Sequence, residues 1–308
     1  MLNYLVKRTI HAVFVILAVL VFVFFIVHLT GDPAELALGT DTSAEEVARF
    51  RTEMGFDRPL YVQFADFLRG ILFKGDFGIS LRYNEPALPI VLERIPATIE
   101  LTAAAMSIAL IVGIPCGLIS ALMRKKLIDI ILRILALLGQ SAPIFWVGIM
   151  LVLVFAVKLQ IFPSSGRDDG WLSIVLPAIT LSHYSAASII RLLRSSVLDT
   201  LTQDYVRTAR AKGIPERIVI VQHIFRNSML PVVTLVGLQF GTLLGGAVVT
   251  ETIFAWPGVG RLIVQAIYNR DIFLIQASVF VIALMFVVLN FLIDVIYTFL
   301  DPRIRINR

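Results

Sequence analysis

Long, almost uninterrupted runs of apolar residues alternate along the chain with shorter polar segments. A helix needs about 20 mostly apolar residues to cross a hydrocarbon core of ~30 Å, and six runs meet that length. Lipid offers the backbone no hydrogen-bond partners, so runs of this kind are expected to be helical. The predicted spans run approximately from Ile10 to Leu29, Thr98 to Met123, Ile134 to Val157, Ser173 to Leu193, Met229 to Thr250 and Phe273 to Leu300.

Composition supports this pattern. Of the 308 residues, 58% are hydrophobic and 16% are charged, whereas soluble chains average about 45–50% apolar and about 25% charged residues. The excess excludes an ordinary soluble enzyme and predicts an all-α polytopic membrane protein with six transmembrane helices. The first run follows Lys7 and Arg8 but ends without a small-x-small cleavage site, so residues 1–30 are predicted to be a retained transmembrane helix rather than a signal peptide.

The charged residues between the spans predict the orientation, because Lys and Arg accumulate in cytoplasmic loops. With the N-terminus inside, sixteen basic residues face five acids on the cytoplasmic side, and eleven basic residues face sixteen acids outside. Both termini are therefore expected to be cytoplasmic. The asymmetry serves insertion first of all.

Residues 31–96 form the one long segment without a membrane signal. Ser43 and Glu46 make a capping-box pattern ahead of an amphipathic helix that should end at Gly55, and a second helix is predicted from Leu60 to Leu72. A turn is expected over residues 75–78. The segment is predicted to be an extracytoplasmic subdomain, serving either as a cap on the helix ends or as a docking ledge for a substrate-delivery protein.

A second polar stretch, residues 199–227, falls on the cytoplasmic side. Within it, a short helix is predicted to begin at the carboxylate of Asp204 and to end in cations before Gly213. Pro215 then starts a further helix. Such a charged helix is most often a solvated loop or a headgroup anchor.

The same stretch carries a family resemblance. Asp204-Tyr205-Val206-Arg207-Thr208-Ala209-Arg210-Ala211-Lys212-Gly213, followed by Arg226-Asn227-Ser228-Met229-Leu230-Pro231, resembles the cytoplasmic signature of ABC importer permeases, in particular the group that imports dipeptides, oligopeptides, glutathione and nickel. Shorter motifs extend the match over nearly the whole chain, at residues 1–4, 7–8, 31–33, 75–78, 95–98, 254–261 and 301–303.

The resemblance implies a type I ABC importer permease fold, with a five-helix core over 97–301 and a cytoplasmic tail over 302–308. It also implies that the short helix is a coupling helix, held in a groove of a separate ATPase. Tyr205 would anchor it, Ala209 and Ala211 would allow close approach, and Gly213 would release the chain. The implied coupling residues are Asp204, Tyr205, Arg207, Thr208, Ala209, Arg210, Ala211, Lys212 and Gly213. Arg207, Thr208 and Ala209 stand where the wider family has Glu-Ala-Ala, so no glutamate contact carries over.

The implied partners are a homologous second permease, two ATPases that bind ATP and Mg, and an extracytoplasmic solute-binding protein, all at the bacterial inner membrane. The chain has no phosphate-binding loop motif, and Ser182-His183 lacks a positioned acid for catalysis. Cys116 is the single cysteine, which leaves no thiolate cluster for a metal. The sequence therefore predicts neither an enzyme nor a resident cofactor, and no nucleic-acid partner.

Two further groups of residues have less specific signals. Gly237, Gly241 and Gly245 recur every four residues and predict either close helix contact or a stripe on the translocation path. Trp256, Pro257 and Gly258 lie in a polar segment, Glu251 to Asp271, that is predicted to be a re-entrant gate or an interfacial anchor.

Asp294 is the one acid of the last span and is a candidate functional group by default. Helix kinks are expected at Pro115, Pro143 and Pro177.

The function predicted from these features is the permease half of an importer that moves short peptides, glutathione among them, by alternating access. One alternative is an ion-driven secondary transporter with its coupling chemistry on Asp294. Others are import of nickel or another small solute by the same machinery, and a membrane scaffold that transports nothing.

Overall fold

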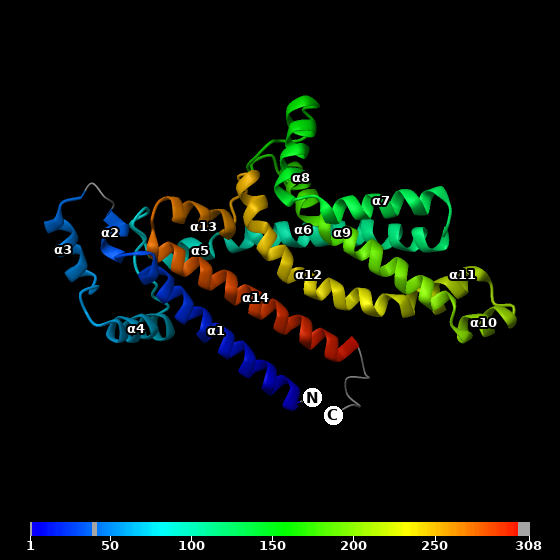
Figure 1. Cartoon of the computed structure of the whole chain (residues 1–308), viewed down its shortest axis with the longest axis horizontal. Coiled ribbons are helices and arrows are strands. Elements are labelled where there is room, and N and C mark those ends of the chain that lie inside the picture. The colour runs from blue at the N-terminus through cyan, green and yellow to red at the C-terminus, as the bar shows by residue number, and fades with distance from the viewer. Residues whose placement is uncertain (1, 39–41, 301–308) are drawn as a thin grey trace. The chain divides into compact units, whose positions relative to one another are not determined.

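The computed structural model describes residues 2–38 and 42–300, and the regular elements within these ranges are all helical (Figure 1). The chain divides into two compact units. The first unit joins Met1–Thr98 to Pro257–Arg308, and the second is Ile99–Trp256.

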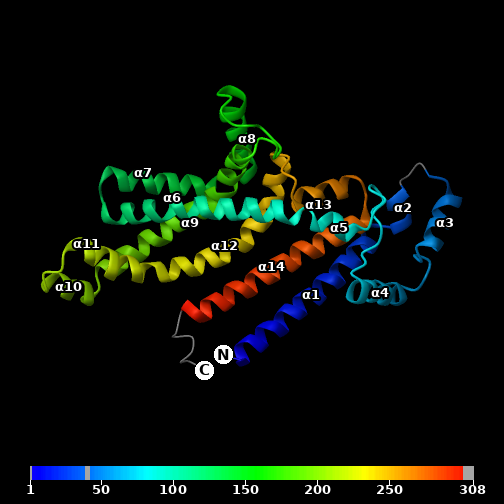
Figure 2. The same cartoon turned by 180° about the vertical axis from the view of Figure 1, so that it is seen from behind.

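The first unit is built on two long helices, α1 and α14, which run side by side in both views (Figures 1 and 2). Its apolar core joins Leu20 of α1 to Leu274 and Val281 of α14, together with side chains of the short helices between them. The helices of this unit are α1 (Leu2–Thr30), α2 (Pro33–Leu38), α3 (Ala44–Glu53), α4 (Leu60–Arg69), the π-helical η1 (Gly70–Lys74), α5 (Ala87–Leu92), α13 (Val259–Tyr268) and α14 (Ile272–Leu300).

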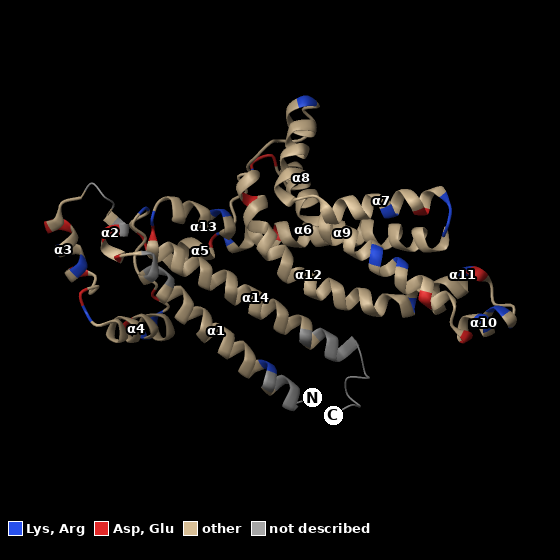
Figure 3. Ribbon diagram, viewed as in Figure 1, with Lys and Arg blue, Asp and Glu red and all other residues tan. Residues whose placement is uncertain are grey.

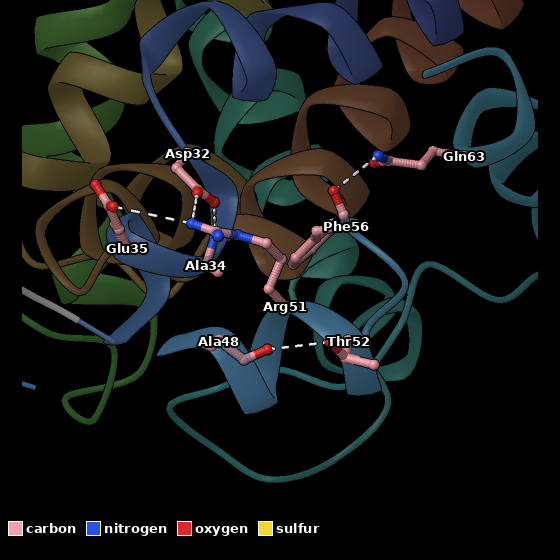
Figure 4. A network of polar contacts seen from close by, with 8 residues as sticks. All are labelled: Asp32, Ala34, Glu35, Ala48, Arg51, Thr52, Phe56 and Gln63. Atoms are coloured by element: carbon pink, nitrogen blue, oxygen red, sulfur yellow. Dashed lines mark hydrogen bonds and ion pairs between the residues drawn. The ribbon is translucent and has the colours of Figure 1, made fainter. Parts of the chain in front are cut away.

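Local signals explain the short helices of segment 31–96. The Ser43 side chain accepts a hydrogen bond from the backbone N–H of Glu46, so the predicted capping box is confirmed. Gly55 follows α3 with φ +72°, a left-handed conformation that glycine adopts without strain. Arg51 of α3 donates to the carboxylate of Asp32 beside α2, and Asp32 also accepts from the N–H of Ala34 at 2.9 Å (Figure 4).

The second unit surrounds one central helix, α9, which contacts α7, α8 and α12. Most of its residues between Leu176 and Ile190 are buried. The helices of this unit are α6 (Ile95–Leu122, which enters it at Ile99), α7 (Leu127–Ser141), α8 (Ile144–Leu151), the π-helical η2 (Val152–Lys158), α9 (Trp171–Leu201), α10 (Asp204–Ala211), α11 (Glu216–Ile218), the π-helical η3 (Val219–Phe225) and α12 (Arg226–Ile253).

The predicted all-α polytopic fold is confirmed. Five helices of the described residues are long and apolar enough to cross a membrane, and a sixth span is added if a bent pair counts as one. The bent pair corrects the prediction of a single run from Ile134 to Val157. The helices Leu127–Ser141 and Ile144–Lys158 meet there at 108°.

A proline stands at the break, although the prolines of the other spans do not interrupt their helices. The residue before a proline avoids the helical region, and Ala142, before Pro143, is extended with φ −74° and ψ 127°. Kinks were predicted at all three prolines. Pro115 and Pro177 lie inside continuous helices, and only Pro143 stands at a full break.

The other spans extend beyond the apolar runs that predicted them. Glu216–Ile253 forms one continuous helical stretch of 38 residues, whereas the sequence predicted a separate helix after Pro215 and a span from Met229 to Thr250. A helix continues past the membrane wherever its backbone bonds and side chains allow it, so apolar length sets only a minimum.

Candidate functional site

The residues of the family-like signature form a short helix with defined ends. The predicted helix is confirmed as α10, which begins at Asp204 after an extended Gln203. A carboxylate in the first turn stabilises the positive end of the helix dipole. At the other end, Gly213 has φ +74°, its N–H donates to Arg210 O at 2.9 Å, and Ile214 N–H donates to Ala209 O at 3.3 Å. These two bonds are those of a Schellman motif.

The two faces of α10 have different environments. Val206 and Ala209 are buried in the apolar core of the second unit, together with Val219 and Ile224 of η3. On the other face, Tyr205 is 43% exposed. The remaining exposed residues of the signature are Asp204, Arg207, Thr208, Arg210, Ala211, Lys212 and Gly213. The helix is therefore held from one side and presents its polar face outward.

An ion pair fixes α10 to the next helix. Arg210 donates from Nη2 to Glu216 Oε1 at 2.6 Å and from Nε to Oε2 at 3.1 Å. This hydrogen-bonded carboxylate raises the pKa of the Arg210 guanidinium, which stays charged. Both side chains are partly exposed, so the pair adds little to stability. Its main effect is geometric, because it connects the two sides of the turn at Gly213.

Charge is concentrated at this end of the second unit. Figure 3 shows acidic and basic residues gathered on α10 and α11, whereas the length of α12 is almost entirely uncharged. Asp204 and Arg207 also lie within 3.6 Å of each other, but both are so exposed that this pair contributes little.

The three glycines of the α12 stripe, Gly237, Gly241 and Gly245, differ in exposure. Gly237 is buried, whereas Gly245 is exposed and a Cβ added there would meet nothing within 4 Å. The close approach is elsewhere, between α6 and α9. A Cβ on Gly113 would lie 2.8 Å from Ile189 Cγ2, and one on Gly117 would lie 3.0 Å from Leu193 Cβ.

Trp256, Pro257 and Gly258 connect α12 to α13. The Trp256 side chain is 1% exposed, with the guanidinium carbon of Arg167 5.7 Å from its ring centre. A ring buried in protein does not lie among lipid headgroups, which argues against an interfacial anchor. Gly258 is the N-cap residue of α13, in the first unit.

Two predicted features fall where the structure gives no side chains. The backbone of Asp294 belongs to α14, but its side chain lies outside the described residues. The predicted tail, 302–308, also lies outside them.

A buried charged cluster in the second unit has no signal in the sequence. Asp129 is 1% exposed and accepts from Arg194 Nε at 2.8 Å, from Ser120 Oγ at 2.8 Å and from the N–H of Lys125 at 3.2 Å. Asp129 of α7 thus connects this helix to α6 and to the C-terminal part of α9. An acid in the first turn of a helix ordinarily complements the helix dipole, and nothing in the sequence pairs Asp129 with a residue 65 positions away.

Residues 2–38 and 42–300 contain no group of three or more His, Cys, Asp or Glu side chains placed to hold an ion. The geometry of α10 is that of a short helix packed on one face and exposed on the other.

Comparison with known proteins gives two family matches that together cover most of the chain. Residues 113–306 match the family described as "Binding-protein-dependent transport system inner membrane component", and residues 1–102 match its N-terminal companion. The chain is 43% identical to the glutathione transport system permease protein GsiC of Pectobacterium atrosepticum and 41% identical to that of Escherichia coli strain K12. Each comparison covers 306 residues, 99% of both chains.

Proposed function

The chain belongs to the family of binding-protein-dependent transport system inner membrane components, and from this premise we propose that it imports short peptides of the glutathione type, driven by partner ATPases. Members of this family are multi-pass permeases of ABC importers and not enzymes. The full-length similarity to glutathione permeases supports a peptide solute, since it covers 99% of both chains.

One observation carries the coupling role: α10 is fixed on one face and free on the other. Buried Val206 and Ala209 attach the helix to the core that contains α9 and α12. A force applied to the exposed face of α10 would therefore move both α9 and α12, and it would not be lost in unwinding of the ends of α10. Ala209 faces this core, so close approach to an ATPase would fall to the exposed Ala211.

The proposed assembly contains a second homologous permease, two ATPases that bind ATP and Mg, and a solute-binding protein. We propose that α10 lies in a groove of one ATPase at the cytoplasmic face. Segment 31–96 would lie on the opposite side and receive the binding protein, and both termini of this chain would be cytoplasmic.

Alternating access follows from the rigidity of these connections. When ATP draws the two ATPases together, α10 would move with them and open the path outward to the binding protein. Hydrolysis would let the ATPases part, and the path would open inward. The Asp129–Arg194 pair joins α7 to α9 and would make these helices move together.

The assembled complex reconstituted in vesicles tests this proposal. Uptake of a labelled tripeptide should require ATP, stop with vanadate and continue when a proton uncoupler removes the ion gradient. An ion-driven transporter would show the reverse, with uptake that survives vanadate and stops with the uncoupler.

Tyr205→Ala tests the interface itself. Buried aromatic anchors contribute about 2 kcal/mol or more to protein interfaces, so binding of the ATPases should weaken roughly 30-fold. Tyr61→Ala is the matched control, because Tyr61 is more exposed but belongs to α4 of the first unit. Equal ATPase binding by both variants would contradict the coupling role of α10.

A further inference from the structure

The second unit has an opening of mixed polar and apolar lining where α7 and α8 meet. The two helices are bent by 108° at a break between Ser141 and Ile144. Beside the break is a cavity of about 230 Å³. Its polar lining residues are His183, Tyr184 and Ser185 of α9 and Thr242 of α12, and the others are Ala142, Ile144, Leu181, Leu243 and Gly246.

Non-helical backbone at membrane depth is tolerated only where protein covers it or where it lines a water-filled space. Part of this requirement is met by α9. The Nε2 atom of His183 lies 3.2 Å from the carbonyl oxygen of Ala142, close enough to donate when that nitrogen carries the proton. His183 thus holds the corner of the broken span against the central helix.

The exposed side chains at this opening can form hydrogen bonds. Tyr184 is 48% exposed, although it lies on the part of α9 that is otherwise mostly buried. Its hydroxyl makes no hydrogen bond to any residue that the structure describes. Thr242 is also exposed, and its Oγ1 donates to Gln239 Oε1 at 2.7 Å, which accepts from Ser185 Oγ as well.

The exposed face of α7, in the same unit, carries apolar side chains instead. The exposed residues of α7 include Ile131, Ile134, Leu135 and Leu138, with Leu135 56% exposed. Polar side chains within spans usually face a bundle interior or a water-filled cavity, because hydrocarbon offers them no partner. The four polar side chains of the opening therefore distinguish it from the apolar face of α7.

We propose that this opening lines a water-filled part of the solute path, and that Tyr184 and Thr242 form hydrogen bonds with the amide groups of a passing peptide. No Asp, Glu, Lys or Arg side chain lines the cavity, and His183 is its one titratable residue. A site of neutral donors and acceptors suits the peptide bond, which every peptide carries, and places no demand on the charge of its side chains. The inference rests on the proposed function and adds the residues that meet the solute.

Cysteine labelling of the complete complex tests the water-filled path. In a Cys116→Ala background, Thr242→Cys and Leu135→Cys are treated with a charged, membrane-impermeant methanethiosulfonate. Thiols react with this reagent as thiolates, which form in water and not in lipid. Thr242→Cys should react at least tenfold faster than Leu135→Cys, and S-methylglutathione, which has no thiol of its own, should slow the reaction.

Tyr184→Phe supplies a second readout, because it removes only the hydroxyl. Loss of one hydrogen bond to the solute should raise the peptide concentration for half-maximal uptake about three- to tenfold, and Phe145→Leu on α8 should not change it. A Thr242→Cys thiol as unreactive as that of Leu135→Cys would overturn the inference, even with uptake intact. Labelling without any ATP-driven uptake would instead overturn the proposed function and leave the water-filled opening in place.

Discussion

Gly213 shows how one residue determines the end of a functional helix. Its φ of +74° closes the Schellman motif that ends α10, and no atom lies within 4 Å of the position a Cβ would occupy. A substitution there would meet backbone strain and no steric clash. The requirement for glycine is conformational, and a left-handed backbone costs a typical residue roughly 1–2 kcal/mol.

Gly213→Val should therefore uncouple the transporter. The strained turn would loosen the link between α10 and α11, so ATP hydrolysis should lose its response to loaded binding protein while uptake falls. Hydrolysis and uptake are measured together in reconstituted vesicles. Unchanged values for both would show that this turn has no role in coupling.

The controls separate strain from position. Asn tolerates left-handed backbone better than other residues, so Gly213→Asn should keep most of the coupling. Gly170 also has a positive φ, +64°, and nothing within 4 Å of an added Cβ. It lies before the N-terminus of α9, whereas α10 follows the C-terminus of α9. Gly170→Val also forces a strained backbone, with φ +64° and ψ −135°, and should leave the response of hydrolysis to binding protein unchanged.

Contact between α6 and α9 depends on small residues. A Cβ on Gly113 would lie 2.9 Å from Ile189 Cβ and 3.2 Å from the backbone oxygen of Ala186, so neither neighbour can move aside easily. In membranes, where helices gain little from the hydrophobic effect on association, such close contact supplies much of the attraction.

Gly113→Ala should destabilise the second unit by about 1–3 kcal/mol, the usual cost of overfilling a tight contact. Gly245→Ala is the matched control on α12, because open space surrounds that position. The measurement is the thermal unfolding midpoint of the purified protein in detergent. Equal midpoints for the two variants would contradict the close α6–α9 contact.

The charge distribution of the whole chain predicts its orientation in the membrane. Cations outnumber acids in the segments predicted to be inside, and acids outnumber cations in those predicted to be outside. Glu45 and Arg217 are exposed residues from the two kinds of segment, so they report on opposite faces.

In a Cys116→Ala background, Glu45→Cys should react with an impermeant thiol reagent only in right-side-out membranes. Arg217→Cys should react only in inverted vesicles. The Cys116→Ala parent, which then has no thiol, gives the background signal. The opposite pattern would reverse the topology and move α10 away from the cytoplasm.

Sequence reasoning succeeded where the signal was local. Ser43 caps α3 and Gly213 ends α10 as predicted, because a cap or a left-handed turn involves residues within five positions of one another. The family signature likewise lies in two short segments of neighbouring residues, 204–213 and 226–231. Its role in coupling stays a prediction.

Sequence reasoning did not reach outcomes that depend on distant partners. Glycines at four-residue spacing occur on α12 and on α6, and the neighbours of Gly113 and Gly117 make the close contact on α6. The role of the α12 stripe, in helix contact or on the solute path, stays a prediction. Pro143 lies at a break while Pro115 and Pro177 do not, although a proline in each apolar run predicts much the same kink.

The sequence by itself determined that the chain is a helical membrane protein, where most of its helices lie and which family it belongs to, because hydrophobic length, caps and motifs are properties of neighbouring residues. Only the tertiary structure decided that Asp129 pairs with Arg194, that Trp256 is buried and that Tyr184 and Thr242 share an opening. These relations join residues on different helices. They follow from which helix faces meet, and a one-dimensional pattern does not specify that.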